Sequence, residues 1–220
     1  MDISVNLNKP EKKVTSHIAI ILDKSGSMGS CREQTISGFN EQIQQIQDTG
    51  KDSKVSFVAF NHEVDTVFWN EDPDRLVPIT SSDYQPSGST AMYDAVGYTI
   101  NRLKDEVGKD DTVLLIIMSD GWENASKKFN QSTLAEMIQE RQSTDKWTIT
   151  YMGANQDLSK ISEDLKIKKG NMSSYTSTQV GTADAFAQMR QATAMYNMGS
   201  VSPRGFYSAP EEEKEETETK

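Results

Sequence analysis

The feature that most constrains the fold is a short apolar run, residues 17–22, that stops abruptly at Asp23 and is followed by Lys24-Ser25-Gly26-Ser27. The run is β-branched and bounded by turn residues, which is typical of a strand buried on both faces of a parallel sheet. In a near-extended segment alternate residues share a face, so Asp23, Ser25 and Ser27 are expected to point at one spot. Carboxylate and hydroxyl oxygens suit a hard cation, Mg²⁺ above all. The stretch therefore predicts a metal site at a strand end.

Helical and buried-strand patterns alternate along the rest of the chain. Helices are expected over residues 32–47, 92–103, 133–142, 158–165 and 182–197, with Thr133 and Glu136 forming a capping box at the third. Buried strands are expected over 55–60, 112–118 and 147–152, with an edge hairpin strand at 65–69 and a weak strand at 171–175. The alternation predicts an α/β fold, doubly wound, with a mainly parallel central sheet and helices on both faces.

The 220 residues are divided into a folded domain over 14–199 and two flanking segments. Residues 1–13 are expected to be an extension with a short edge strand at 3–7. Residues 200–220 have no periodicity and finish in six Glu and two Lys, which predicts a disordered acidic tail. This tail has two interpretations: a solvated segment that ignores the metal, or an internal ligand whose Glu side chains occupy the metal site.

Composition excludes several classes of function. The net charge of −10 argues against nucleic-acid binding. Cys31 is the single cysteine, so neither an intramolecular disulfide nor a thiolate metal cluster is possible. The N-terminal stretch does not resemble a signal peptide, and no apolar run reaches membrane-spanning length. A cytoplasmic protein without a membrane partner is therefore expected.

Two further stretches converge on the first, because ligands in open α/β sheets sit beyond the carboxyl ends of the strands. The stretches are Gly88-Ser89-Thr90 before a helix and Ser119-Asp120-Gly121 after a buried strand. Together with Asp23-x-Ser25-x-Ser27 they resemble the metal-ion-dependent adhesion site of a von Willebrand factor A domain, a likeness that covers about residues 14–197. The segments 123–126 and 153–157 are similar to the small intracellular version found in bacteria and their phages.

The resemblance implies a bound Mg²⁺ or Mn²⁺ with Ser25 and Ser27 as direct ligands. Asp23 and Asp120 would act mostly through water, and Thr90 directly or through water. Neutral hydroxyl ligands leave the ion electrophilic, so an open position favours the Asp or Glu of a partner protein. The expected function is a non-enzymatic, metal-dependent protein-binding module.

Four side chains near the predicted metal site are candidates for contact with the partner: Lys24, Met28, Tyr93 and Trp122. Trp122 follows Asp120-Gly121 directly and has two interpretations, an exposed aromatic anchor at an interface or a residue packed on the following helix.

The competing function is a Mg²⁺-dependent phosphohydrolase. A phosphoaspartyl hydrolase needs a second carboxylate two residues after the nucleophilic Asp, and that position is Ser25. The loops that converge on the metal also offer no His as a general base. The sequence therefore favours binding over catalysis.

Overall fold

The computed structural model describes residues 14–50 and 52–208. The helices are α1 (Arg32–Thr49), α2 (Met92–Glu106), α3 (Gln131–Gln142), α4 (Leu158–Leu165) and α5 (Gln179–Asn197). The strands are β1 (Ser16–Asp23), β2 (Ser53–Phe60), β3 (Val64–Glu71), β4 (Thr112–Ser119), β5 (Trp147–Ala154) and β6 (Met172–Tyr175). Three short 3₁₀ helices are η1 (Gly26–Cys31), η2 (Pro73–Arg75) and η3 (Lys169–Asn171).

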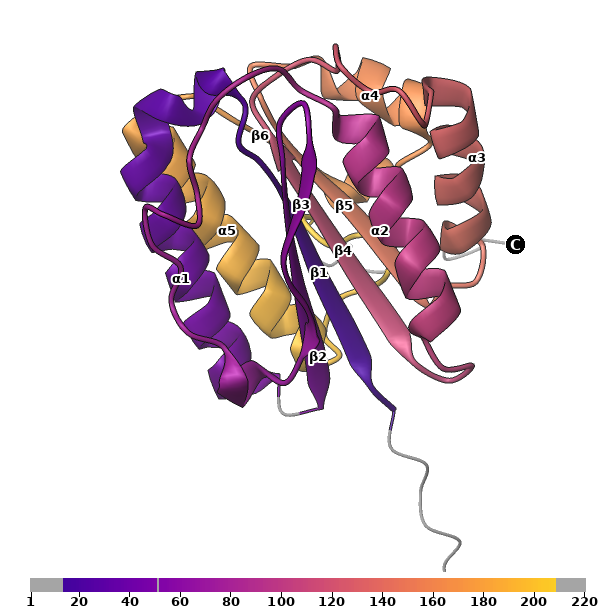
Figure 1. Cartoon of the computed structure of the whole chain (residues 1–220). Helices are drawn as coiled ribbons and strands as arrows, with labels where there is room; N and C mark the ends of the chain where they lie inside the picture. The colour runs from indigo at the N-terminus through magenta and orange to yellow at the C-terminus, as the bar shows by residue number, and fades with distance from the viewer. Residues whose placement is uncertain (1–13, 51, 209–220) are drawn as a thin grey trace, which may run out of the picture.

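The strands of this part of the chain form one six-stranded sheet in the order β3-β2-β1-β4-β5-β6. Every neighbouring pair is parallel except β2 and β3, which form an antiparallel hairpin at one edge. Helices α1 and α5 cover one face of the sheet, and α2, α3 and α4 cover the other (Figure 1). The predicted α/β class, the mainly parallel sheet and the edge hairpin are confirmed.

The core has two halves because side chains alternate across each strand. From β1, Ile18, Ile20 and Leu22 pack toward α1 and α5, whereas Ala19 and Ile21 pack toward the helices of the other face. The central strands β1 and β4 are buried along almost their entire length, which explains why both appear in the sequence as unbroken apolar runs.

Two helix starts differ from the sequence prediction. The capping box of α3 is formed by Asn130 and Thr133, so the helix begins three residues before the Thr133–Glu136 pair would start it. The last helix begins at Gln179, where the Thr178 hydroxyl accepts the N–H of Gly181. In both cases the residue that caps the helix lies upstream of the predicted start, because a cap is set by a local hydrogen bond and not by the apolar pattern.

The predicted disordered tail is wrong for residues 200–208, which pack against the domain. Phe206 is only 2% exposed and lies in the core half beside α5. The backbone of this segment is fixed to η3, since Asn171 accepts the N–H of Phe206 and donates to the carbonyl of Pro203. The predicted extension at 1–13, its strand at 3–7, and the acidic residues 209–220 lie outside the described residues.

Candidate functional site

The candidate site lies where β1 and β4 end, at the point where the strand order changes direction. The chain passes from β1 through α1 to β2 on one side, and later through α2 to β4 on the other side of β1. The loop after β1 leads to α1 on one face of the sheet, and the loop after β4 leads to α3 on the other face (Figure 1). In open α/β sheets ligands bind at such a point, beyond the carboxyl ends of the strands. Asp23 is the last residue of β1, and Asp120 directly follows β4.

Asp23 is the most deeply placed side chain of the site, with no exposed surface. Its Oδ1 accepts the N–H of Ser25 at 2.7 Å, and its Oδ2 accepts the hydroxyl of Ser119 at 2.6 Å. Burial raises the pKa of Asp23, the hydrogen bonds from Ser119 and Ser25 oppose that rise, and the charge of Asp120 adds to it. The carboxylate is held rigidly but lacks a compensating positive charge among the groups that shift its pKa.

Ser25, Ser27 and Asp120 form a chain of oxygen atoms above Asp23. The hydroxyls of Ser25 and Ser27 lie 3.1 Å apart, and Ser27 donates to Asp120 Oδ1 at 2.5 Å. The predicted extended segment is correct only as far as Ser25, since Ser27 lies in the 3₁₀ turn η1. The turn still brings both hydroxyls together, because it begins one residue after Ser25.

Thr90 completes the group of five predicted ligands. A Cβ atom placed on Gly121 would lie 2.9 Å from Thr90 Oγ1, 3.6 Å from Asp23 Oδ2 and 3.7 Å from Ser25 Oγ. Oxygen atoms from two separate stretches therefore lie around the position that a side chain of Gly121, in the third stretch, would occupy. The donor set is all oxygen, which fits Mg²⁺ or Mn²⁺.

The five predicted ligands differ in how far their side chains are exposed to solvent. Asp23, Ser25 and Thr90 are buried, Asp120 is half-buried, and Ser27 is exposed. No three His, Cys, Asp or Glu side chains gather into a metal-holding group in the part of the chain that the structure describes. A cation at this position would therefore depend on hydroxyl oxygens as much as on its two carboxylates, and it would be accessible from solvent on one side.

Gly88 shapes the loop that carries Thr90. Its φ of +73° lies in the left-handed region, and a Cβ atom there would come within 2.4 Å of His62 Nδ1. The next residues are fixed to the loop after β4, because the Thr90 N–H donates to Asn124 Oδ1 and the Thr90 carbonyl accepts two N–H groups from that loop. Thr90 is thus positioned by backbone contacts on both sides.

Sequence reasoning missed two residues that hold the site together. Ser177, in the connection between β6 and α5, donates to Asp120 Oδ2 at 3.1 Å. Gln156 donates to the carbonyl of Gly121 at 2.6 Å and accepts from the Tyr151 hydroxyl. The segment containing Gln156 had contributed to the family resemblance, whereas a single Ser between two Thr residues gives no sequence signal of its own.

The four predicted partner-contact residues are in very different environments. The prediction that Met28 contacts the partner is wrong. Met28 is 1% exposed and packs in the core, because the 3₁₀ turn η1 directs its side chain inward. Lys24 forms an ion pair with Asp65 of the β2–β3 hairpin. Tyr93 is half-buried at the start of α2, and Trp122 is 55% exposed. The packed interpretation of Trp122 is therefore wrong, and its side chain is available at the surface.

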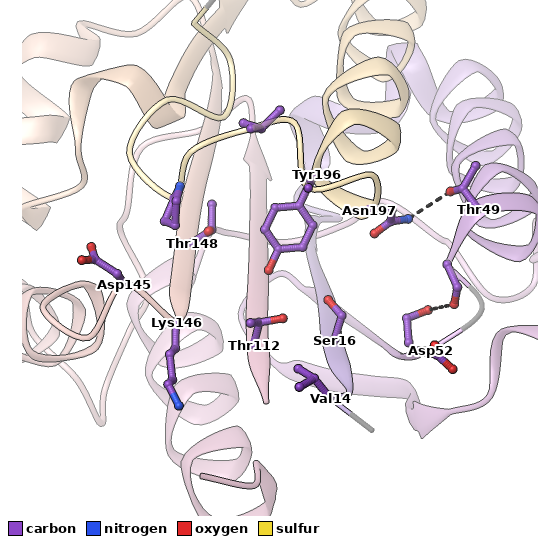
Figure 2. A pocket seen from close by; sticks show the side chains of 15 residues that line it. Val14, Ser16, Thr49, Asp52, Thr112, Asp145, Lys146, Thr148, Tyr196 and Asn197 are labelled. Atoms are coloured by element: carbon purple, nitrogen blue, oxygen red, sulfur yellow. Dashed lines mark hydrogen bonds between the residues drawn. The ribbon is translucent and has the colours of Figure 1, made fainter. Parts of the chain in front are cut away.

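A cavity of about 440 Å³ lies at the opposite ends of the strands, near the starts of β1 and β4. Tyr196 from the end of α5 lies near Ser16 and Thr112 at the starts of β1 and β4 (Figure 2). None of the predicted site residues lines it. The size of a cavity is thus a poor guide here, since the convergent oxygen atoms lie at the other end of the same strands.

Comparisons with known proteins agree on the fold. A von Willebrand factor type A protein from Catenulispora acidiphila is 19% identical, with a TM-score of 0.56 over 82% of this chain and 43% of that chain. Proximal thread matrix protein 1 from the mussel byssus is 17% identical, with a TM-score of 0.56 over 87% of this chain and 48% of that one. The corresponding domain of the type V pili tip protein Mfa5 from Porphyromonas gingivalis is 12% identical, with a TM-score of 0.61 over 86% and 97%.

The chain spans less than half the length of the first two of these proteins. None of the curated protein sequences matches it. The sequence model of the von Willebrand factor type A domain, however, matches residues 17–193, which include the candidate site from Asp23 to Asp120 and all six strands except one residue of β1. The chain therefore belongs to the von Willebrand factor type A domain family.

Proposed function

We propose that this protein is a non-enzymatic, Mg²⁺-dependent protein-binding module. Asp23, Ser25, Ser27, Thr90 and Asp120 would hold the ion at the carboxyl edge of the sheet. When bound, Mg²⁺ or Mn²⁺ would supply an electrophilic centre for a carboxylate oxygen, so the partner is a protein that presents Asp or Glu. The family is often used in protein–protein interaction, which agrees with this role.

The observation that carries the proposal is the convergence of oxygen atoms around Gly121. Thr90, Asp23 and Ser25 all face the space that a side chain there would fill. Asp23 is buried in that group and has a raised pKa, so a cation would compensate a charge that the fold otherwise leaves costly. The graded exposure leaves Ser27 and Asp120 accessible to a partner.

A catalytic role has less support. Of the two His residues, His17 lies near the start of β1, at the far edge of the sheet, and His62 packs against Gly88. In the described chain His62 makes no hydrogen bond to Asp23 or Asp120, so neither carboxylate has a paired general base.

The one cysteine, Cys31, is a buried free thiol, which suits our further proposal of a cytoplasmic protein of the intracellular bacterial or phage type.

No helix in the described ranges is long and apolar enough to cross a membrane. A pull-down from lysate in Mg²⁺, eluted with EDTA, tests for a partner, with immobilised wild type and Asp120→Asn in parallel. Proteins that bind through the metal should elute from wild type only. Asp145→Asn, at the opposite edge, is a matched control that should retain them.

Isothermal titration of Mg²⁺ into the same three proteins tests the metal site directly. Wild type and Asp145→Asn should bind one ion, and Asp120→Asn should bind at least about tenfold more weakly, as expected when a charged ligand is replaced by a neutral one. Failure of the wild type to bind Mg²⁺, or equal binding by Asp120→Asn, would refute the proposed site.

A further inference from the structure

A second, smaller cavity of about 190 Å³ adjoins the candidate metal site. Gly121 borders both: its missing side chain opens the oxygen-lined space, and it also lines this cavity. Most of the lining comes from the loop after β4, the start of α2 and helix α4. The lining residues that matter here are Tyr93, Trp122, Lys160, Ile161 and Asp164. The cavity therefore lies directly beside the proposed metal site.

The loop that carries Trp122 is fixed in place on both sides of that residue. Glu123 accepts the N–H groups of Tyr93, Ala125 and Ser126 at 2.7–2.9 Å, together with the Ser126 hydroxyl at 2.8 Å. On the other side, Gln156 holds the carbonyl of Gly121. A rigid backbone thus presents a large aromatic side chain that is 55% exposed, a combination found at the energetic centres of interfaces.

The charges around the cavity are unequal. Glu123 and Asp164 are acidic and Lys160 is basic, which leaves a net charge of −1 among the ionisable groups that face it. The two acids differ, since the oxygens of Glu123 already accept four hydrogen bonds. Asp164 is half-buried and makes no ion pair or hydrogen bond with any residue in the described ranges. Asp164 is therefore the acceptor that remains available.

Tyr93 lines the cavity together with both acids, and its backbone N–H donates to Glu123. Burial raises the pKa of its hydroxyl, and the charges of Glu123 and Asp164 raise it further. Both carboxylates therefore act electrostatically on an aromatic side chain that lines the cavity. An aromatic wall in a negative field is an environment that attracts a cation.

We propose that this cavity binds a basic side chain, Arg foremost, of the same partner whose carboxylate reaches the metal. The inference rests on the proposed function and adds a second recognition point to it. The guanidinium would lie against Tyr93 and Trp122 and pair with Asp164, while its aliphatic stem covers Ile161. Lys160 is exposed at the rim, where its flexible stem lets the ammonium group move toward solvent.

An acidic occupant would meet the net negative charge of the lining, and an apolar one would leave Asp164 desolvated without a partner. The partner is thus a peptide segment that combines one acidic and one basic residue at a short, fixed distance.

The test uses a set of synthetic glycine-rich peptides, each with a single Glu for the metal. In each peptide one position, between one and five residues before or after the Glu, is Gly, Arg or Leu. Binding is followed by ¹H–¹⁵N NMR in Mg²⁺ and in EDTA. At one offset, Arg should tighten Mg²⁺-dependent binding roughly tenfold over Gly, about the size of one cation–π contact with one half-buried ion pair. The indole N–H resonance of Trp122 should shift with the Arg peptide.

Variants of α4 assign the effect to the cavity. The Arg-to-Gly affinity ratio should fall from about tenfold to about threefold in Asp164→Asn, because the contact with Tyr93 and Trp122 remains when the ion pair is lost. Asp164→Lys should prefer a second Glu over Arg at that offset. Glu163→Gln, an exposed neighbour on the same helix, is the matched control and should keep the tenfold ratio.

The outcomes separate the two proposals. If the Gly peptide binds in Mg²⁺ but Arg adds nothing at any offset, or if Leu binds more tightly than Arg, the basic-residue inference is overturned and the metal site stands. An unchanged ratio in Asp164→Asn would also overturn it. If no peptide binds in a Mg²⁺-dependent manner, the proposed function fails and this inference fails with it.

Discussion

The Asp23→Asn variant should be at least as stable as wild type without Mg²⁺ and less stable than wild type with Mg²⁺. Asp23 is fully buried, and its two oxygens accept the Ser25 N–H and the Ser119 hydroxyl. Asn has the same shape, so its carbonyl oxygen can keep the first bond and its amide can donate to the Ser119 oxygen. The substitution therefore removes a buried charge near Asp120 and leaves the number of hydrogen bonds unchanged.

Without Mg²⁺, the variant should be at least as stable as wild type. Removing the buried charge contributes stability on the order of 1 kcal/mol, partly offset because hydrogen bonds to a neutral group are weaker. With Mg²⁺ at about 100 times its Kd, binding to folded wild type adds about 2.7 kcal/mol. For a domain of about 200 residues this corresponds to a rise of about 5–11 °C in Tm, which Asp23→Asn should mostly lose.

The measurement is thermal unfolding of both proteins in EDTA and in a series of Mg²⁺ concentrations. Asp111→Asn is the matched control, because Asp111 also accepts two hydrogen bonds, from the N–H groups of Thr15 and Gly108, but lies near the opposite ends of the strands. Its Tm difference from wild type should be the same at every Mg²⁺ concentration. Equal Mg²⁺ increments in wild type and Asp23→Asn, or a large loss of stability of this variant in EDTA, would refute the reasoning.

Three further changes test the surroundings of the site. Gly88→Ala should destabilise the fold by about 1–3 kcal/mol in urea unfolding, because its φ is positive and His62 obstructs a Cβ atom; adding His62→Ala should recover only the steric part. Burial alone would raise the pKa of Asp94, but hydrogen bonds from the N–H groups of residues 127–129 lower this pKa below 3.8. The ionised Asp94 therefore stabilises the folded protein above that pH, and this contribution is lost as the pH falls through the folded-state pKa. The stability gap to Asp94→Asn should narrow accordingly in acid unfolding, and a gap that widens would contradict this sign. Phe206→Ala should cost about 3–5 kcal/mol yet leave Mg²⁺ affinity unchanged, whereas a negligible cost would mean that residues 200–208 do not pack as described.

The sheet was predictable because the central strands are apolar on both faces. β1 and β4 each appear as an unbroken run that ends in an acid, and parallel strands bring such ends together at one edge. The meeting of Asp23 and Asp120 therefore follows from topology, without knowledge of any side-chain contact. That these residues bind a metal stays a prediction.

The parts that sequence reasoning missed share one physical cause, which is that they depend on single contacts between distant segments. Ser177 supports Asp120 across 57 positions, and Asn171 fixes Phe206 across 35, yet neither contact leaves a periodic pattern. Residues 200–208 contain Gly, Pro and Ser, so their composition indicated a tail although Phe206 is buried in the core. Periodicity identifies an element by the face that it buries, and these segments bury only one or two side chains. The Ser177 contact also joins the start of α5 to the candidate site, so any movement of that helix must break or carry with it a hydrogen bond to Asp120.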